Sequence, residues 1–171
     1  VTFHDWMKAA LYDPASGYYQ RSDRERWGRA GDYRTSPERS ALFAATFARY
    51  FARLYEELGR PASWTIVECG AGSGDFAAGV LRTLLRQFPS VFEATRYIVY
   101  EISNDALARA RARLSEFDHR VGFITDWAQV AVDKGVVFSN ELLDAFPVHR
   151  VVQTEAGLRE LLQGYPPGYE D

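Results

Sequence analysis

The chain has 171 residues, 47% of them hydrophobic, so it is long enough for one domain with a substantial core and too short to argue for two. The formal net charge is -3, so the chain lacks the excess of positive charge that is typical of nucleic-acid-binding proteins. No stretch resembles a transmembrane span or a signal peptide. The single cysteine, Cys69, excludes an internal disulfide, and three histidines without ligand-like spacing argue against a metal site. We therefore expect a reducing, soluble compartment, no nucleic acid partner and no membrane insertion.

The amino-terminal third predicts two helices separated by a long loop. Apolar residues at helical spacing indicate a short amphipathic helix over residues 3–12. A turn-rich run from Ala15 to Pro37 shows little periodicity, and loops of this length are often functional. Ser36-Pro37-Glu38 is typical of a helix start, and the helix continues to about Leu58. We interpret its apolar stripe as core, formed by Phe43, Phe47, Tyr50, Phe51, Leu54 and Leu58.

From residue 64 onward, strand-like and helix-like patterns alternate. The predicted strands are 64–69, 96–101, 120–124, 135–140 and 148–154; the predicted helices are 75–88 and 104–117, with only a turn or two of helix between 125 and 134. Such alternation indicates βαβ units and a parallel sheet, that is, a Rossmann-like α/β fold. We expect an amino-terminal helical and lid extension over residues 1–60 and the core over 61–171, together one compact domain.

The most informative motif is Glu68-Cys69-Gly70-Ala71-Gly72-Ser73-Gly74-Asp75, which joins the first core strand to its helix. Gly70, Gly72 and Gly74 allow a tight turn and bring a ligand against bare N–H groups. The glycine-rich motif of dinucleotide-binding proteins has a further glycine at the position where this chain has Asp75. A carboxylate at that position would repel a pyrophosphate. A cationic ligand without phosphate would tolerate both Glu68 and Asp75. The motif therefore favours S-adenosylmethionine.

A second acidic residue, Glu101, supports this interpretation. Glu101 ends the strand 96–101, and the carboxyl ends of parallel strands meet at the edge where ligands bind, so Glu101 would accept hydrogen bonds from the ribose hydroxyls. Asp126 could accept from the adenine amino group while Trp127 packs on the ring. The alternative is a tight turn beside a solvated glutamate.

Several longer sequence motifs resemble those of a known protein family. They are Asn140-Glu141-Leu142-Leu143-Asp144-Ala145-Phe146-Pro147, Gly31-Asp32-Tyr33-Arg34-Thr35-Ser36-Pro37-Glu38, Asp126-Trp127, and the amino-terminal pairs and triplet Trp6-Met7, Leu11-Tyr12 and Gly17-Tyr18-Tyr19. The set resembles the MidA-like methyltransferases from about residue 3 to 161. Family members are longer, which implies that the carboxyl-terminal part of the family fold is missing here; the start at Val1 also indicates a fragment or a processed form.

The resemblance implies a class I methyltransferase fold and S-adenosyl-L-methionine as methyl donor. The mitochondrial family member is a protein arginine methyltransferase needed for assembly of respiratory complex I, so the resemblance implies a protein substrate, in a respiratory complex. It also implies the cytoplasm if the source is bacterial, and the mitochondrial matrix if it is eukaryotic.

If the acceptor is a guanidinium group, paired carboxylates would orient it, and Glu141 and Asp144, with Asn140 beside them, are the candidates. The alternative is that Asn140 and Asp144 cap the next helical turn. Asp32, Arg34 and Thr35 could form a lid, with Arg34 meeting the methionine carboxylate.

Two other functions stay open at this point. A cofactor-binding assembly factor would act by docking, without chemistry. A nicotinamide-dependent oxidoreductase is disfavoured by Asp75 in the glycine motif.

Overall fold

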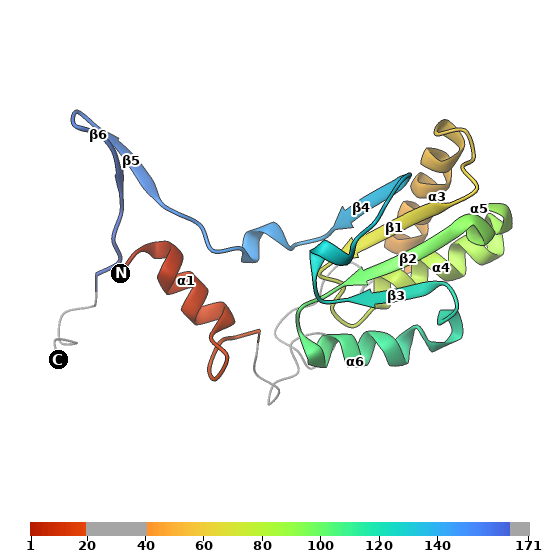
Figure 1. The fold of residues 1–171 in the computed structure, drawn as a ribbon, viewed down its shortest axis with the longest axis horizontal. Helices are drawn as coiled ribbons and strands as arrows, with labels where there is room; N and C mark the ends of the chain where they lie inside the picture. The colour runs from red at the N-terminus through yellow and green to blue at the C-terminus, as the bar shows by residue number, and fades with distance from the viewer. Residues whose placement is uncertain (20–40, 165–171) are drawn as a thin grey trace. The chain divides into compact units, whose positions relative to one another are not determined.

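The computed structural model describes residues 1–19 and 41–164 (Figure 1). The chain divides into two compact units. The sheet unit is Arg24–Asn140, and the terminal unit combines Val1–Asp23 with Glu141–Asp171. The expected division into an extension over residues 1–60 and a core over residues 61–171, together one compact domain, stays a prediction.

The sheet unit is built on four parallel strands. In spatial order these are β3 (Val121–Ile124), β2 (Thr95–Tyr100), β1 (Trp64–Cys69) and β4 (Gly135–Ser139). In this register Cys69 lies beside Tyr100 on one side and Ser139 on the other, so the carboxyl ends of neighbouring strands meet at one edge of the sheet. The predicted parallel α/β sheet is confirmed.

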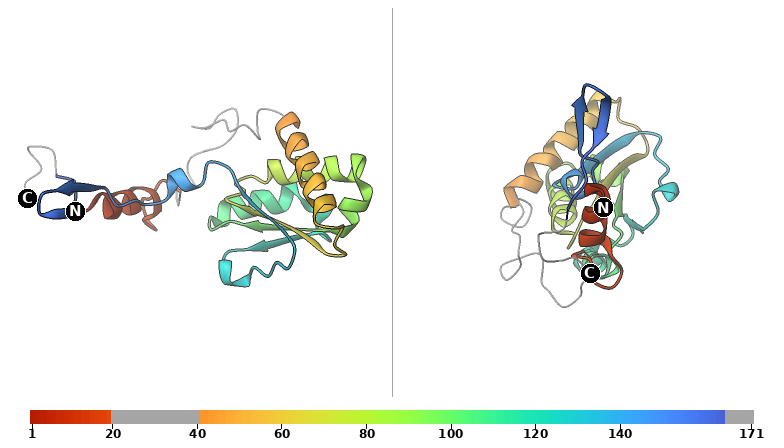
Figure 2. Two further views of the ribbon diagram at one scale, coloured as in Figure 1. Left: turned by 90° about the horizontal axis from the view of Figure 1, so that it is seen from above. Right: turned by 90° about the vertical axis from the view of Figure 1, so that its left-hand side faces the viewer.

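Helices cover one face of this sheet (Figure 2, left view). They are α3 (Ala41–Glu57), α4 (Asp75–Gln87) and α6 (Asn104–Arg113). Aromatic side chains fill the space between the helices and the sheet, where the Phe76 ring stacks on Phe138 at 4.5 Å. Phe51 is buried and Phe47 packs against the same cluster, which confirms most of the predicted stripe on α3.

The predicted apolar stripe of α3 was wrong at two positions, and the segments between the helices and strands differ from the predicted ones. Tyr50 and Leu58 lie about half exposed. A short helix, α5 (Pro89–Ala94), was not predicted; Pro89 restarts a helix at its first position after α4 ends. The predicted helix 104–117 ends at Arg113, and a separate 3-10 turn follows, η1 (Ser115–Phe117). The expected short turn before β4 is η2 (Trp127–Gln129).

The terminal unit holds α1 (Phe3–Tyr12), as predicted, and the 3-10 turn η3 (Leu143–Ala145). The strand expected over 148–154 is β5 (Val151–Thr154), and it was wrongly grouped with the parallel sheet. It pairs antiparallel with β6 (Gly157–Glu160), a strand that was not predicted. Glu155 and Ala156 lie between the two strands, and Gly157, the first residue of β6, has a positive φ of 101°.

Within the described ranges 1–19 and 41–164, no helix combines the length and the apolar character needed to cross a membrane.

Candidate functional site

The glycine turn leads from β1 into α4 at the carboxyl edge of the sheet. Gly70, Gly72 and Gly74 have φ values of 71°, 54° and 79°, all in the left-handed region that favours glycine. The Gly70 N–H donates to the carbonyl oxygen of Tyr100 at 2.8 Å, which ties the turn to the end of β2. The tight turn predicted from the glycine spacing is therefore present.

Gly74 also has a packing role. A Cβ at this residue would lie 3.1 Å from the Cα of Ala110 and 3.2 Å from its Cβ, so the glycine allows α6 to pack closely against the turn. This contact explains Gly74 structurally, and its predicted role as part of the cofactor floor stays a prediction.

Glu101 lies directly after β2 and reaches the glycine turn. One carboxylate oxygen accepts from the Gly72 N–H at 3.2 Å and the other accepts from the Ser103 N–H at 3.0 Å. A carboxylate offers about four lone-pair positions, so these two bonds leave capacity for further donors such as hydroxyl groups. The predicted position of Glu101 beside the glycine turn is therefore confirmed.

Glu68 points into the sheet unit and lies against Tyr97. Its carboxyl is buried, and the Tyr97 hydroxyl donates to it at 2.7 Å. Burial raises the pKa of Glu68 to about 8; the nearby negative charge of Glu101 also raises it, while the Tyr97 hydrogen bond lowers it. Burial likewise raises the pKa of the Tyr97 hydroxyl. Glu68 is therefore largely protonated at neutral pH, and its predicted contact with the cofactor stays a prediction.

The raised pKa of Glu68 predicts a pH-dependent stability. An ordinary glutamate titrates near 4.5, so between about pH 4.5 and 8 the folded state holds a proton that the unfolded state has released. The free energy of unfolding should therefore fall as the pH rises through this window, by at most about 1.4 kcal/mol per pH unit. We expect Glu68→Gln to remove this slope in denaturant titrations at pH 5 and pH 8. Glu155→Gln, at an exposed position, is the matched control and should keep it; parallel curves for wild type and Glu68→Gln would contradict the assignment.

Asp75 is paired within the protein. Its carboxylate accepts from the Ser73 hydroxyl at 2.7 Å and forms an ion pair with Arg113 of α6 at 2.6 Å. Because Arg113 offsets its charge, Asp75 repels a phosphate less than the sequence suggested. The argument against a dinucleotide that depended on Asp75 is correspondingly weaker.

Asp126 and Trp127 lie just past β3, at the same edge. One oxygen of Asp126 accepts from the Ala128 N–H at 2.9 Å and caps η2, which leaves its second oxygen for another donor. Trp127 is 46% exposed, and its ring meets that of Tyr100 edge-on at 5.6 Å. The adenine contacts of Asp126 and Trp127 stay predictions.

The three proposed catalytic residues follow β4. Asn140 is the last residue of the sheet unit, and Glu141 and Asp144 belong to the terminal unit. Glu141 has φ of 49°, an uncommon conformation for a residue other than glycine and one that is typical of functional positions. Leu142 is the N-cap of η3 and no side chain caps that turn, so the alternative that Asn140 or Asp144 serves as its cap was wrong. Their catalytic role stays a prediction.

The predicted lid residues Asp32, Arg34 and Thr35 lie outside the described residues, as does the helix start Ser36-Pro37-Glu38.

Sequence reasoning missed three partners at this edge: Tyr97 for Glu68, Arg113 for Asp75, and Ser103 for Glu101. Only Ser103 left a usable signal. It is the N-cap of α6, where its hydroxyl accepts from the Ala106 N–H, and a serine directly before a helix is a recognisable start signal.

The chain is similar to proteins of one known family. The model of a family described as an S-adenosyl-L-methionine-dependent methyltransferase matches residues 46–170. The chain is 27% identical to "Protein arginine methyltransferase NDUFAF7, mitochondrial" from Xenopus tropicalis and covers 44% of it, and it is 28% identical to the Homo sapiens protein of that name and covers 43%; each match spans 100% of this chain. The chain therefore spans less than half the length of these curated relatives.

A solved structure is also similar. A Burkholderia thailandensis protein bound to S-adenosyl-homocysteine superposes with a TM-score of 0.76 and 33% identity, covering 94% of this chain and 41% of that one. The ligand in that structure is the demethylated form of the cofactor that the glycine motif and Glu101 predict.

Proposed function

The chain belongs to the family of S-adenosyl-L-methionine-dependent methyltransferases, and from that premise we propose that the whole protein methylates an arginine side chain of another protein. The family confirms the predicted Rossmann-like fold and the predicted cofactor. The observation that carries the proposal to this chain's own residues is the pair of hydrogen bonds from the Gly72 and Ser103 N–H groups to Glu101. They place an acceptor for hydroxyl donors beside a left-handed glycine turn.

We assign the parts of the cofactor as follows. Gly70, Gly72 and Gly74 form the backbone floor, and Glu101 accepts from the ribose hydroxyls. The second oxygen of Asp126 accepts from the adenine amino group, and the exposed Trp127 ring packs on the adenine. Arg34, with Asp32 and Thr35, meets the methionine carboxylate as part of a lid. Glu68, whose carboxyl accepts from the Tyr97 hydroxyl, is the remaining residue that we assign to the cofactor site.

The acceptor side of the site requires little acid–base chemistry. When bound, S-adenosyl-L-methionine supplies an activated methyl group for in-line displacement, so the protein chiefly has to orient the nucleophile and exclude water. A guanidinium group arrives charged because its pKa exceeds 12. Glu141 and Asp144 would hold its nitrogens by charge-assisted hydrogen bonds, with Asn140 as an additional acceptor.

The names of the relatives support the acceptor and the compartment that we propose. Proteins matched over the whole of this chain are named protein arginine methyltransferases and mitochondrial. We propose a protein substrate that is a subunit of a respiratory complex, and the bacterial cytoplasm or the mitochondrial matrix as the compartment. A docking factor that binds the cofactor without transfer is the competing function. The family match contradicts a nicotinamide-dependent oxidoreductase.

The full-length protein tests this proposal. It is incubated with S-adenosyl-L-methionine carrying a labelled methyl group and with extract of its own cells, and the labelled protein is digested and sequenced by mass spectrometry. We expect label on an arginine. Cofactor binding by calorimetry without any transfer would favour the docking factor, and label on another residue type would overturn the assignment of arginine.

A further inference from the structure

The amino-terminal helix α1 contacts the segment that carries the proposed catalytic carboxylates. The Tyr12 hydroxyl, at the last residue of α1, donates to the carbonyl oxygen of Ala145 at 3.0 Å. The two residues are 133 positions apart in the chain, and Tyr12 is half-buried. Ala145 is the last residue of η3 and directly follows Asp144. A single hydroxyl thus connects α1 to the turn that bears Asp144.

Tyr12 is itself held firmly. After α1 the chain folds back, and the N–H groups of Tyr18 and Tyr19 donate to the carbonyl oxygens of Ala10 and Leu11, each at 2.9 Å. Gly17 makes this reversal possible, because a Cβ there would lie 2.4 Å from the backbone nitrogen of Asp13. The Tyr19 ring packs on the Tyr12 ring at 5.5 Å. The position of the Tyr12 hydroxyl is therefore set by both backbone and ring contacts.

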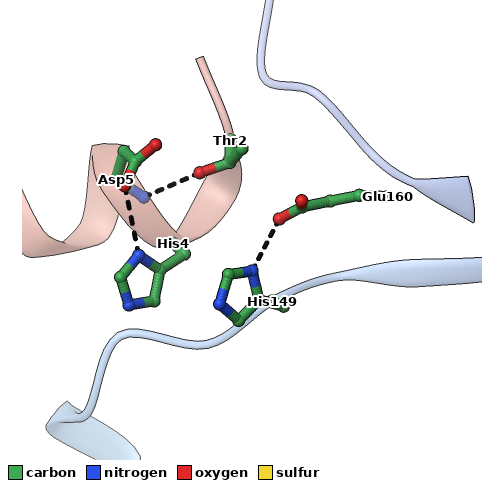
Figure 3. A network of polar contacts seen from close by, with 5 residues as sticks. All are labelled: Thr2, His4, Asp5, His149 and Glu160. Carbon is green, nitrogen blue, oxygen red and sulfur yellow. Dashed lines mark hydrogen bonds and ion pairs between the residues drawn. The ribbon is translucent and has the colours of Figure 1, made fainter.

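The other end of α1 is anchored to the residues beyond η3 (Figure 3). The His4 ring stacks on the His149 ring at 4.5 Å with the planes 5° apart, and His149 also contacts the Glu160 carboxylate at 2.7 Å. Arg150 lies over the Phe3 ring at 5.2 Å. Contacts near both ends of α1 thus fix the helix along the segment 145–150.

Among residues 1–19 and 41–164, few other contacts hold the η3 turn in place. It is three residues long, and its internal hydrogen bonds, from Ala145 to Leu142 and from Phe146 to Leu143, measure 3.1 and 3.2 Å. Leu143 is 68% exposed and Phe146 is 45% exposed, so burial of its apolar side chains contributes little. A single 3-10 turn gains little stability from its own hydrogen bonds, so contacts from outside the turn contribute to its position.

We propose that Tyr12 is a positioning residue for methyl transfer: its hydroxyl fixes η3 and thereby the direction of the Asp144 carboxylate. The inference rests on the proposed function, because it takes Asp144 to orient the acceptor. It adds a role for the amino-terminal helix, which that function does not otherwise use. In this proposal Tyr12 acts through the Ala145 carbonyl.

The test uses Tyr12→Phe in the full-length protein, which removes the hydroxyl and keeps the ring that packs on Tyr19. We expect amide hydrogen exchange in residues 142–147 to become about three- to tenfold faster, the effect of losing one hydrogen bond. We also expect kcat for methyl transfer to fall by a similar factor, with the cofactor Kd unchanged. Tyr50→Phe is the matched control, because Tyr50 is an exposed tyrosine of α3, and it should change neither quantity.

The outcomes separate this inference from the function on which it rests. Unchanged exchange in 142–147, or faster exchange with an unchanged kcat, would overturn the positioning role. A loss of kcat accompanied by weaker cofactor binding would overturn it too, since that result indicates general damage to the fold. If the unaltered protein transfers no methyl group at all, the proposed function fails, whereas the exchange measurement still reports whether Tyr12 holds the turn.

Discussion

Replacing Glu101 by alanine is expected to weaken binding of S-adenosyl-homocysteine about ten- to hundredfold. The change removes the proposed charge-assisted hydrogen bonds to the ribose hydroxyls, worth roughly 1.5 to 3 kcal/mol. It also removes the acceptor of the Gly72 and Ser103 N–H groups, so the glycine turn loses one connection to the end of β2 and keeps the backbone bond from Gly70 to Tyr100. Calorimetric titration of the full-length protein measures the effect directly.

Two further variants separate the contributions at Glu101. Glu101→Gln keeps the shape of the side chain but offers one acceptor oxygen in place of two, so it can satisfy the N–H of Gly72 or that of Ser103 but not both. We expect an intermediate affinity. Glu155→Ala makes the same truncation at an exposed position and should bind as the wild type does. Wild-type affinity for Glu101→Ala would remove Glu101 from the cofactor site.

The sheet unit could be predicted from the sequence because its signals are local. Strand patterns with helices between them specify parallel pairing, and the strand ends then fall at one edge whatever the packing in detail. The position of Glu101 beside the glycine turn follows from this rule, and the hydrogen bond from the Gly72 N–H to Glu101 confirms it. The φ values of Gly70, Gly72 and Gly74 follow from the same local pattern.

The parts that were missed depend on contacts between distant residues. Sequence reasoning did not predict that the strand register sets Glu68 beside β2, where its carboxyl accepts from the Tyr97 hydroxyl. Asp75 was given a free negative charge, but Arg113 on α6 lies within reach of it. Periodicity predicts which residues form α6, and it does not predict which α4 residue a particular arginine will contact.

The hairpin of β5 and β6 shows a second limit. A short apolar run such as 151–154 has the same pattern whether its partner is parallel or antiparallel. The partner is decided by the loop, and Glu155-Ala156-Gly157 is not among the strong hairpin signals, such as Asn-Gly, that a sequence displays.

Replacing Glu141 by glutamine, or Asp144 by asparagine, is expected to lower kcat for methyl transfer about hundredfold, the lower end of what positioned ionisable groups contribute. Both changes keep the size of the side chain and remove the charge that would hold a guanidinium group. The cofactor Kd should stay at its wild-type value, because the proposed cofactor contacts come from other residues. Labelled methyl transfer to the acceptor identified in extract measures the rate, and calorimetry measures the Kd.

Matched controls make this result specific. Glu155→Gln and Asp133→Asn remove the same charges at exposed positions outside the proposed site and should keep the wild-type rate. If Glu141→Gln and Asp144→Asn both transfer methyl groups at the wild-type rate, the acceptor is not held by these carboxylates. If one variant loses activity and the other does not, a single carboxylate suffices, and the left-handed backbone at Glu141 favours that residue as the one that has been placed for contact with the acceptor.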